Sequence, residues 1–100
     1  MPRNVRGRLT PEQAFGKVLR EVRQKQGMSQ EALGFESGYH RTYIGMLERG
    51  LMNPTLQTIL SVTTALEIPP GELVQRVSAC LGENWKKGKE APETKATVKR

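Results

Sequence analysis

The chain has 100 residues, of which 36% are hydrophobic and 26% charged, and its formal net charge is +6 at pH 7. This length and composition favour one small globular domain and exclude a disordered chain. No apolar run approaches the roughly 20 residues that span a bilayer, so a membrane partner is not expected. Cys80 is the only cysteine, which excludes an internal disulfide and a cysteine metal site and favours a reducing cytoplasm. Neither a metal nor a cofactor is expected.

The positive charge lies at the two ends of the chain. Residues 1–10 carry three arginines and no acid, residues 11–82 are neutral overall, and residues 83–100 carry six basic and three acidic side chains. We expect a flexible basic arm over 1–10, one domain over 11–82 and a flexible charged tail over 83–100. Basic flanks are typical of nucleic-acid binding and equally of solubilising tails. The basic residues of the two flanks that lie closest to the domain are Arg3, Arg6, Arg8, Lys86, Lys87 and Lys89.

The first helix is predicted to begin after Thr10. Thr10 can cap it, Pro11 suits the first helical position, and Gln13 stands three residues after the cap, as in a capping box. Gly27 ends the helix. Apolar side chains repeat at helical spacing and define its buried face, namely Phe15, Val18, Leu19 and Val22.

Two short helices follow, separated by a tight turn. Ser29 caps the first, Gly38 ends it, and the second is predicted at about residues 40–49, before Gly50. Helices joined so closely cross at a large angle, and Gly34 lets their backbones approach. Apolar residues are expected to face the core, namely Ala32, Leu33, Phe35, Ile44 and Leu47.

Two further helices complete a compact all-α domain of five helices. Thr55 can cap the fourth, Pro69 and Pro70 break the chain after it, and the fifth is predicted over about residues 71–81. The fourth carries Leu56, Ile59, Leu60, Thr63 and Leu66. The apolar face of the fifth is formed by Leu73, Val74, Val77 and Leu81.

The outward face of the third predicted helix suits DNA. It starts with His40, Arg41, Thr42 and Tyr43, which are polar or cationic, and has no acid before Glu48. An α-helix fits the major groove, where its N-terminal residues reach base edges. From these residues alone, an ordinary helical hairpin with a solvated polar face explains the pattern equally well.

Many residues between positions 14 and 74 stand at the spacings of one family. They are Ser29-Gln30-Glu31-Ala32-Leu33, Gly38, His40-Arg41-Thr42-Tyr43-Ile44, Leu47-Glu48-Arg49-Gly50, Asn53-Pro54-Thr55-Leu56 and Ala65-Leu66. Here the chain resembles the Cro/repressor-type helix-turn-helix family, the XRE family of bacterial and phage regulators. The resemblance implies a repressor-like five-helix domain whose third helix enters the major groove.

The resemblance also implies a role for individual residues. Base contacts are expected from His40, Arg41, Thr42 and Met46, with Arg41 reading guanine. Phosphate contacts are expected from Gln30, Tyr43, Arg49, Asn53 and Thr55. Arg23 and Glu48 are expected to form a partly buried salt bridge that sets the third helix, the alternative being solvated surface charge at both positions.

The chain departs from the family's pattern at a few positions. Tyr39 replaces a small apolar residue at the turn, and Gly45 replaces a common serine, which loosens the helix. Leu51 and Met52 stand in a loop that is often polar in the family, which favours a protein contact there.

The implied partner is double-stranded DNA with a palindromic operator, bound by a homodimer that acts as a repressor or autoregulator. The dimer is expected to form through Leu73, Val77, Leu81 and Trp85, although closure of the domain explains the same leucines as well. The alternative is a protein-interaction module with a protein partner, such as an antitoxin or adaptor. An enzyme is not expected, because the chain has one histidine, no aspartate and no nucleophile–base, phosphate-loop or metal-ligand spacing.

Overall fold

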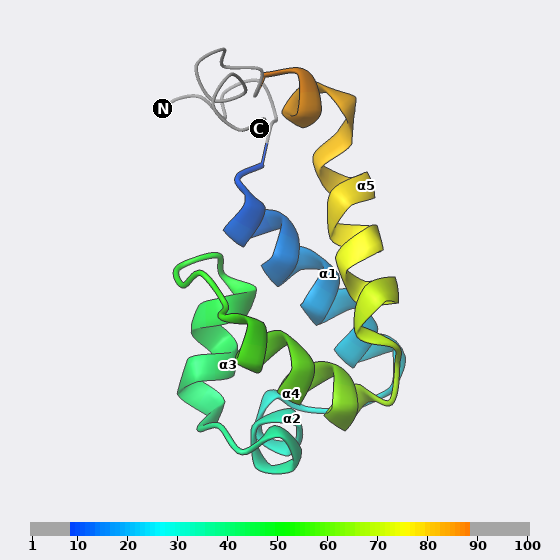
Figure 1. Cartoon of the computed structure of the whole chain (residues 1–100). Helices are drawn as coiled ribbons and strands as arrows, with labels where there is room; N and C mark the ends of the chain where they lie inside the picture. Colours follow the sequence, from blue (N-terminus) through cyan, green and yellow to red (C-terminus); the bar gives the residue numbers. More distant parts are fainter. Residues whose placement is uncertain (1–8, 89–100) are drawn as a thin grey trace.

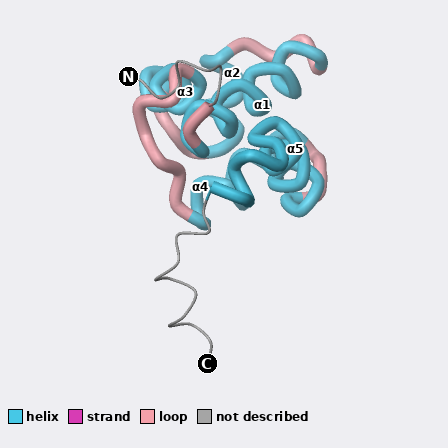
Figure 2. The backbone as a smooth tube through the Cα atoms, turned by 90° about the horizontal axis from the view of Figure 1, so that it is seen from above, coloured by secondary structure: helices cyan, strands magenta, loops and turns pink. Residues whose placement is uncertain are grey.

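The computed structural model describes residues 9–88, with side chains for residues 9–82. This part of the chain consists of helices and connecting loops, with no strand (Figures 1 and 2). The helices are α1 (Pro11–Lys25), α2 (Gln30–Ser37), α3 (Arg41–Glu48), α4 (Leu56–Leu66) and α5 (Pro70–Gly88). Figure 1 shows α1 and α5 side by side, with α2, α3 and α4 gathered at one end of the pair.

The predicted capping residues begin three of the five helices. Thr10 and Gln13 form a capping box, in which the Thr10 hydroxyl accepts from the Gln13 N–H at 3.1 Å and the Gln13 side chain accepts from the Thr10 N–H at 3.0 Å. The Ser29 side chain accepts from the Ala32 N–H at 2.9 Å and starts α2. Thr55 starts α4 in the same way. Each cap satisfies a backbone donor that the first helical turn leaves without an intrahelical partner.

Two glycines permit the tight turn between α2 and α3. Gly38 has φ +86° and ψ 19°, a left-handed conformation that costs glycine little and other residues more. A Cβ atom on Gly34 would lie 2.5 Å from the Tyr39 carbonyl oxygen, so only glycine allows the two helices to approach this closely. The predicted close approach at Gly34 is therefore confirmed.

One hydrophobic core joins all five helices. Its largest fully buried side chains come from every helix, and those of apolar type are Leu19, Leu33, Ile44, Leu47, Val62, Leu66 and Leu73. Full burial of a leucine or isoleucine stabilises the fold by about 1.5–3 kcal/mol. Because Ile44 and Leu47 are both 0% exposed, the opposite side of α3 must face outward.

Several side chains lie elsewhere than the sequence predicted. Phe35 is 84% exposed, because the short helix α2 turns Leu33 and Gly34 inward and so directs the next position away from the core. Leu56 and Leu60 of α4 are also exposed, since Thr58, Val62 and Leu66 occupy its inner face. These three apolar residues are therefore surface residues.

Helix α5 differs from its prediction in two ways. Leu73 is 0% exposed and belongs to the core, which favours closure of the domain over a dimer contact for this leucine. The helix also extends beyond the predicted end near residue 81 to Gly88, with one non-helical residue, Gly82, at φ 79° and ψ 179°. This backbone conformation is essentially confined to glycine, so Gly82 sets the direction of the last helical turns.

Candidate nucleic-acid interface

The outward side of α3 carries the residues predicted to contact bases. His40, Arg41 and Thr42 are exposed at its N-terminal end, and Met46, one turn later, is half-buried. They share one surface because the core holds the opposite side of the same helix. The candidate base-reading residues are therefore accessible around the first turn of α3, with Met46 partly accessible one turn after Thr42.

His40 caps α3 through its ring. Its Nδ1 atom accepts a hydrogen bond from the Thr42 N–H at 3.0 Å. An accepting Nδ1 carries no hydrogen, so the hydrogen of the neutral ring is on Nε2, where it can be donated. The ring thus organises the start of the helix and leaves one donor for another partner.

Arg41 lies near Glu31, a neighbour that the sequence alone did not predict. Its Nη1 atom lies 3.7 Å from Oε1 of Glu31, with 62% and 76% of the two side chains exposed. Exposed pairs of this kind contribute about 0–1 kcal/mol, so DNA can readily replace Glu31 as the partner of Arg41.

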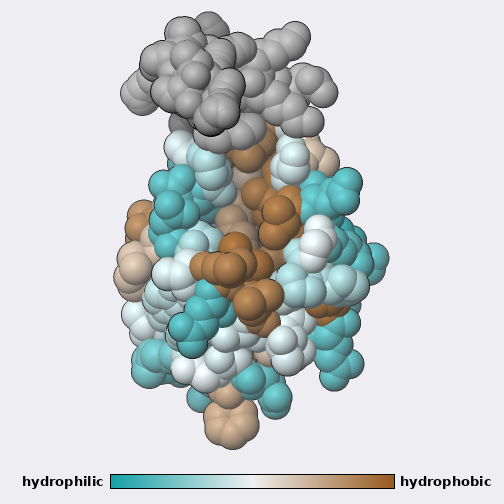
Figure 3. Space-filling model, viewed as in Figure 1, coloured by the Kyte–Doolittle hydropathy of each residue, from teal (hydrophilic) through white to brown (hydrophobic). Residues whose placement is uncertain are grey.

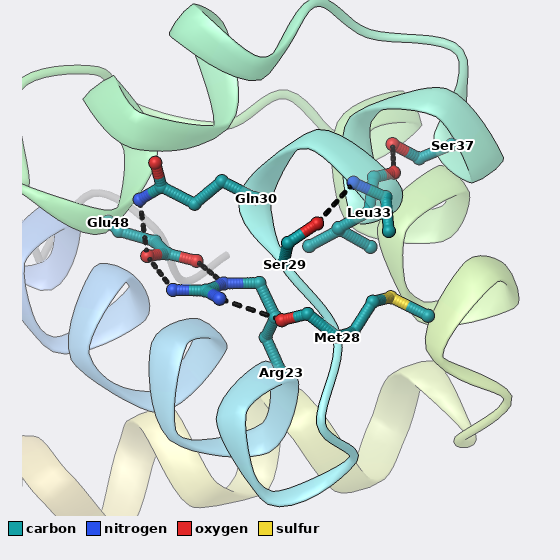
Figure 4. A network of polar contacts seen from close by, with 8 residues as sticks. Arg23, Met28, Ser29, Gln30, Leu33, Ser37 and Glu48 are labelled. Carbon is teal, nitrogen blue, oxygen red and sulfur yellow. Dashed lines mark hydrogen bonds and ion pairs between the residues drawn. The ribbon is translucent and has the colours of Figure 1, made fainter.

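A buried polar network holds α3 against α1 and α2 (Figure 4). The Arg23 guanidinium donates to both carboxylate oxygens of Glu48, from Nε at 2.6 Å and from Nη2 at 2.9 Å. Their side chains are only 9% and 3% exposed. Arg23 also donates from Nη1 to the Met28 carbonyl oxygen at 2.8 Å. The predicted salt bridge is therefore formed, and its hydrogen bond to Glu48 raises the pKa of Arg23.

Gln30 joins this network at the start of α2. Its Nε2 atom donates to Oε1 of Glu48 at 2.9 Å. A Cβ atom on Gly45 would lie 3.5 Å from both the Gln30 Oε1 and the Arg49 Nη1 atoms, so these two side chains meet over Gly45. The second amide hydrogen of Gln30 and the Arg49 guanidinium are the donors that this arrangement offers to an anion.

A cluster of hydroxyl groups, formed by Tyr39, Tyr43, Thr55 and Thr58, joins α3 to the start of α4. The Oγ1 atom of Thr58 lies 3.3 Å from the Tyr39 hydroxyl, 3.2 Å from that of Tyr43 and 3.0 Å from that of Thr55. Tyr43 and Thr55 are predicted phosphate contacts, whereas the sequence did not point to Thr58, which is 2% exposed. The 3-residue spacing of Thr55 and Thr58 and the 4-residue spacing of the tyrosines were the available signals.

The remaining candidates divide between surface and half-buried positions. Arg49 and Asn53 are exposed beside α3, as is Thr55. Val77 is half-buried against the core, and Leu81 is also half-buried. The side chains of Trp85, Lys86 and Lys87 lie beyond the side chains that the structure describes, and Arg3, Arg6, Arg8 and Lys89 lie outside the described residues.

Neither a metal site nor a membrane span is found in the part of the chain that the structure describes. Between residues 9 and 82, no three His, Cys, Asp or Glu side chains are grouped so that they could hold a metal ion. No helix between residues 9 and 88 has the length and apolar character needed to cross a bilayer.

Comparison with known proteins finds a helix-turn-helix family model and two similar control proteins. A family model described as helix-turn-helix matches residues 19–73. Control protein C.BamHI of Bacillus amyloliquefaciens is 44% identical over 61 residues, which cover 60% of this chain and 75% of that protein. The crystal structure of the restriction-modification controller protein C.AhdI from Aeromonas hydrophila is 50% identical, covers 62% of this chain and 94% of its own, and has a TM-score of 0.61.

A solved complex extends the comparison to a DNA-bound state. It contains the restriction-modification controller protein C.Esp1396I as a tetramer with its natural 35 base-pair operator. That chain is 25% identical, the match covers 73% of this chain and 96% of the other, and the TM-score is 0.67.

Proposed function

The chain belongs to the helix-turn-helix family of DNA-binding transcription regulators, and we propose that it is a restriction–modification controller protein that binds its operator as a homodimer. The observation that carries this proposal is the 50% identity with C.AhdI over 94% of that chain. The exposed N-terminal end of α3, with His40, Arg41 and Thr42, supplies the surface that such a function requires. Its role is binding rather than catalysis.

Helix α3 reads base edges in the major groove. The guanidinium of Arg41 leaves Glu31 and donates two hydrogen bonds to O6 and N7 of a guanine. His40 donates from Nε2 to a base acceptor, Thr42 offers its hydroxyl, and Met46 packs against a thymine methyl group. Each good bidentate contact discriminates against the wrong base by about 1–3 kcal/mol.

The phosphate groups are held on either side of α3. On one side, the free amide hydrogen of Gln30 and the N-terminus of α2 attract a phosphate. Asn53 and Thr55 are exposed between α3 and α4 and hold the backbone on the other side, together with Tyr43, whereas the Arg49 side chain reaches the Gln30 side over Gly45. Such contacts fix the register of the protein on DNA without carrying sequence information.

The homodimer forms through the apolar surface of α4 and α5. Figure 3 shows hydrophobic residues gathered on the face that carries these helices and the part of α1 between them. Leu60 and Val74 are 45% and 47% exposed, so they replace the buried Leu73 as candidate contacts beside Val77 and Leu81. A two-fold dimer places its recognition helices about 34 Å apart, which matches a palindromic operator.

Selection of bound sequences from random duplex DNA tests this proposal. The parent is expected to select a symmetric motif with fixed half-site spacing. Arg41→Ala is expected to relax one position of each half-site by about 1–3 kcal/mol. Arg76→Ala is the control, because it removes the same charge from α5, where Arg76 lies near Glu72 of its own helix. Binding that follows only salt concentration, with no motif, would contradict the proposal.

A protein-interaction module, such as an antitoxin or adaptor, is the second candidate. Phe35 and Leu51 favour it, since they are 84% and 63% exposed and lie outside α4 and α5. Purification of the tagged chain from its own host distinguishes the two functions. A stoichiometric protein partner that blocks DNA binding supports the second candidate, whereas copurification with operator DNA alone supports the first.

A further inference from the structure

We propose that Thr58 is a positioning residue for DNA binding, because its buried hydroxyl directs those of Tyr43 and Thr55 toward the phosphate backbone. The inference rests on the proposed DNA-binding function. Thr58 does not touch DNA in this arrangement, since it is 2% exposed beneath the residues that do. It acts through its neighbours at the junction of α3 and α4.

Thr58 is the hub of the hydroxyl cluster. Its Oγ1 atom is the only oxygen that lies within hydrogen-bond distance of all three other members, at 3.3 Å for Tyr39, 3.2 Å for Tyr43 and 3.0 Å for Thr55. The tyrosine rings also contact each other, with centroids 4.9 Å apart and planes inclined by 39°. Thr58 therefore ties together the turn before α3, the first turn of α3 and the cap of α4.

The number of hydroxyl hydrogens in the cluster limits which hydrogen bonds Thr58 can make. A threonine hydroxyl donates one hydrogen bond and accepts two, so Thr58 satisfies all three neighbours only if two of them donate to it and it donates to the third. That third hydroxyl keeps its own hydrogen free. Among the four hydroxyls of the cluster, one hydrogen is thus always left over, and rotation of the Thr58 hydroxyl decides which neighbour carries it.

A DNA phosphate selects one of these arrangements. Phosphate oxygens accept hydrogen bonds and donate none, so they require a hydroxyl with a free hydrogen. Thr55 is exposed, Tyr43 is half-buried, and both stand where the phosphate contacts are proposed. When Thr58 donates to either of them, that residue can donate to phosphate while every contact inside the cluster is kept.

Binding measurements on five variants test this inference. Thr58→Val keeps the shape of the side chain but removes the hub, and Thr58→Ser restores the hydroxyl. Thr63→Val is the matched control, because Thr63 is a second threonine of α4, 0% exposed, whose hydroxyl bonds only carbonyl oxygens of its own helix. Tyr43→Phe, alone and with Thr58→Val, shows whether Thr58 acts through Tyr43. Kd is measured for the selected operator and for a scrambled duplex, at a temperature where circular dichroism shows each variant folded.

Thr58→Val is expected to raise Kd about tenfold for both duplexes, because hydroxyls of Tyr43 and Thr55 that are no longer held in place contact phosphate less well, whatever the sequence. Thr58→Ser is expected to recover most of that loss, and Thr63→Val to change Kd by less than about twofold. In the Tyr43→Phe background, Thr58→Val is expected to have a smaller effect than in the parent.

Two outcomes would overturn the inference. One is a Thr58→Val protein that, when folded, binds as tightly as Thr63→Val. The other is an effect of Thr58→Val that Thr58→Ser does not reverse. In both, the parent still binds its operator, so the proposed function stands. A parent that binds no operator contradicts the proposed function itself.

Discussion

His40 has two roles in this fold, which can be separated by substitution. Its Nδ1 atom caps α3 at Thr42, which leaves the Nε2 hydrogen for a second partner. Histidine is not among the preferred capping residues, which are serine, threonine, aspartate and asparagine. Its use at this position is explained if the ring also contacts a base.

His40→Ala is expected to lower the free energy of unfolding by about 1 kcal/mol, because the cap is lost. His40→Asn keeps a side-chain oxygen that can cap α3 and is expected to match the parent in urea unfolding. Both variants remove the imidazole, so both are expected to weaken operator binding. Operator binding by His40→Asn that equals the parent's would show that the ring only caps the helix.

The Arg23–Glu48 pair gives a second test at the residue scale. Glu48→Ala leaves a buried guanidinium without its partner, and it is expected to lower the free energy of unfolding by about 3–5 kcal/mol in urea denaturation. Replacing both residues by methionine removes both charges, and this double variant is expected to recover most of the loss. A double variant as unstable as Glu48→Ala would contradict this account.

The stability that the Arg23–Glu48 pair contributes is not expected to change with pH through titration of Arg23. The pKa of Arg23 is raised, so its contribution to stability is complete below the unfolded value and is lost only as pH rises through the folded value. Arginine is charged throughout the range from about pH 7 to about pH 9. The stability difference between parent and Glu48→Ala should therefore stay constant over that range.

At the scale of elements, α1 and α3 approach closely at one glycine. A Cβ atom on Gly16 would lie 2.3 Å from the Leu47 carbonyl oxygen and 2.6 Å from that of Glu48. Gly45, inside α3, has a different environment, because its nearest neighbours are the ends of two flexible side chains at 3.5 Å. Gly16 is thus required by packing, whereas Gly45 is not.

Alanine substitutions at these two glycines are expected to act in opposite directions. Gly45→Ala should raise the free energy of unfolding by about 0.5–1 kcal/mol, since alanine favours a helix more than glycine does. Gly16→Ala should lower it by about 1–3 kcal/mol, because the added carbon forces α1 and α3 apart. Thermal unfolding of the two variants checks both signs, and a destabilised Gly45→Ala would refute the assigned environment.

The sequence predicted the helices better than it predicted their faces. Thr10, Ser29 and Thr55 mark helix starts through local hydrogen bonds, which depend only on nearby residues. Whether a residue such as Phe35 or Leu60 is buried depends on which face a neighbouring helix covers, and short helices leave that choice open. The hydroxyl cluster was missed for the same reason, since it joins residues of the α2–α3 turn, α3 and α4 that only the fold brings together.

At the scale of the whole molecule, a neutral core domain carries its apolar and its DNA-reading surfaces on different elements. The proposed reading residues lie on α3 and its cap, and three exposed apolar residues, Leu56, Leu60 and Val74, lie on α4 and α5. A dimer through the second surface leaves the first one free. This separation allows one chain to bind a second copy and DNA at the same time.

Val74→Glu is expected to shift the protein from dimer to monomer in sedimentation velocity, because it places a charge in the apolar surface of α5. Phe35→Glu is the control, since Phe35 is more exposed but lies on α2. It is expected to remain dimeric. Loss of the dimer in Phe35→Glu alone would place the interface at α2 instead of α5, and a monomeric parent would contradict the proposed homodimer.

The network around Glu48 has a consequence for how such proteins diverge. The side chains that fix the angle of α3 are buried, whereas His40, Arg41 and Thr42 are exposed and hold no part of the core. Surface substitutions usually change stability by less than about 0.5 kcal/mol, so Arg41 and Thr42 can be exchanged at little cost to folding. Descendants of one ancestral scaffold can therefore acquire different operators by a few changes, and two such regulators can operate in one cell without cross-talk.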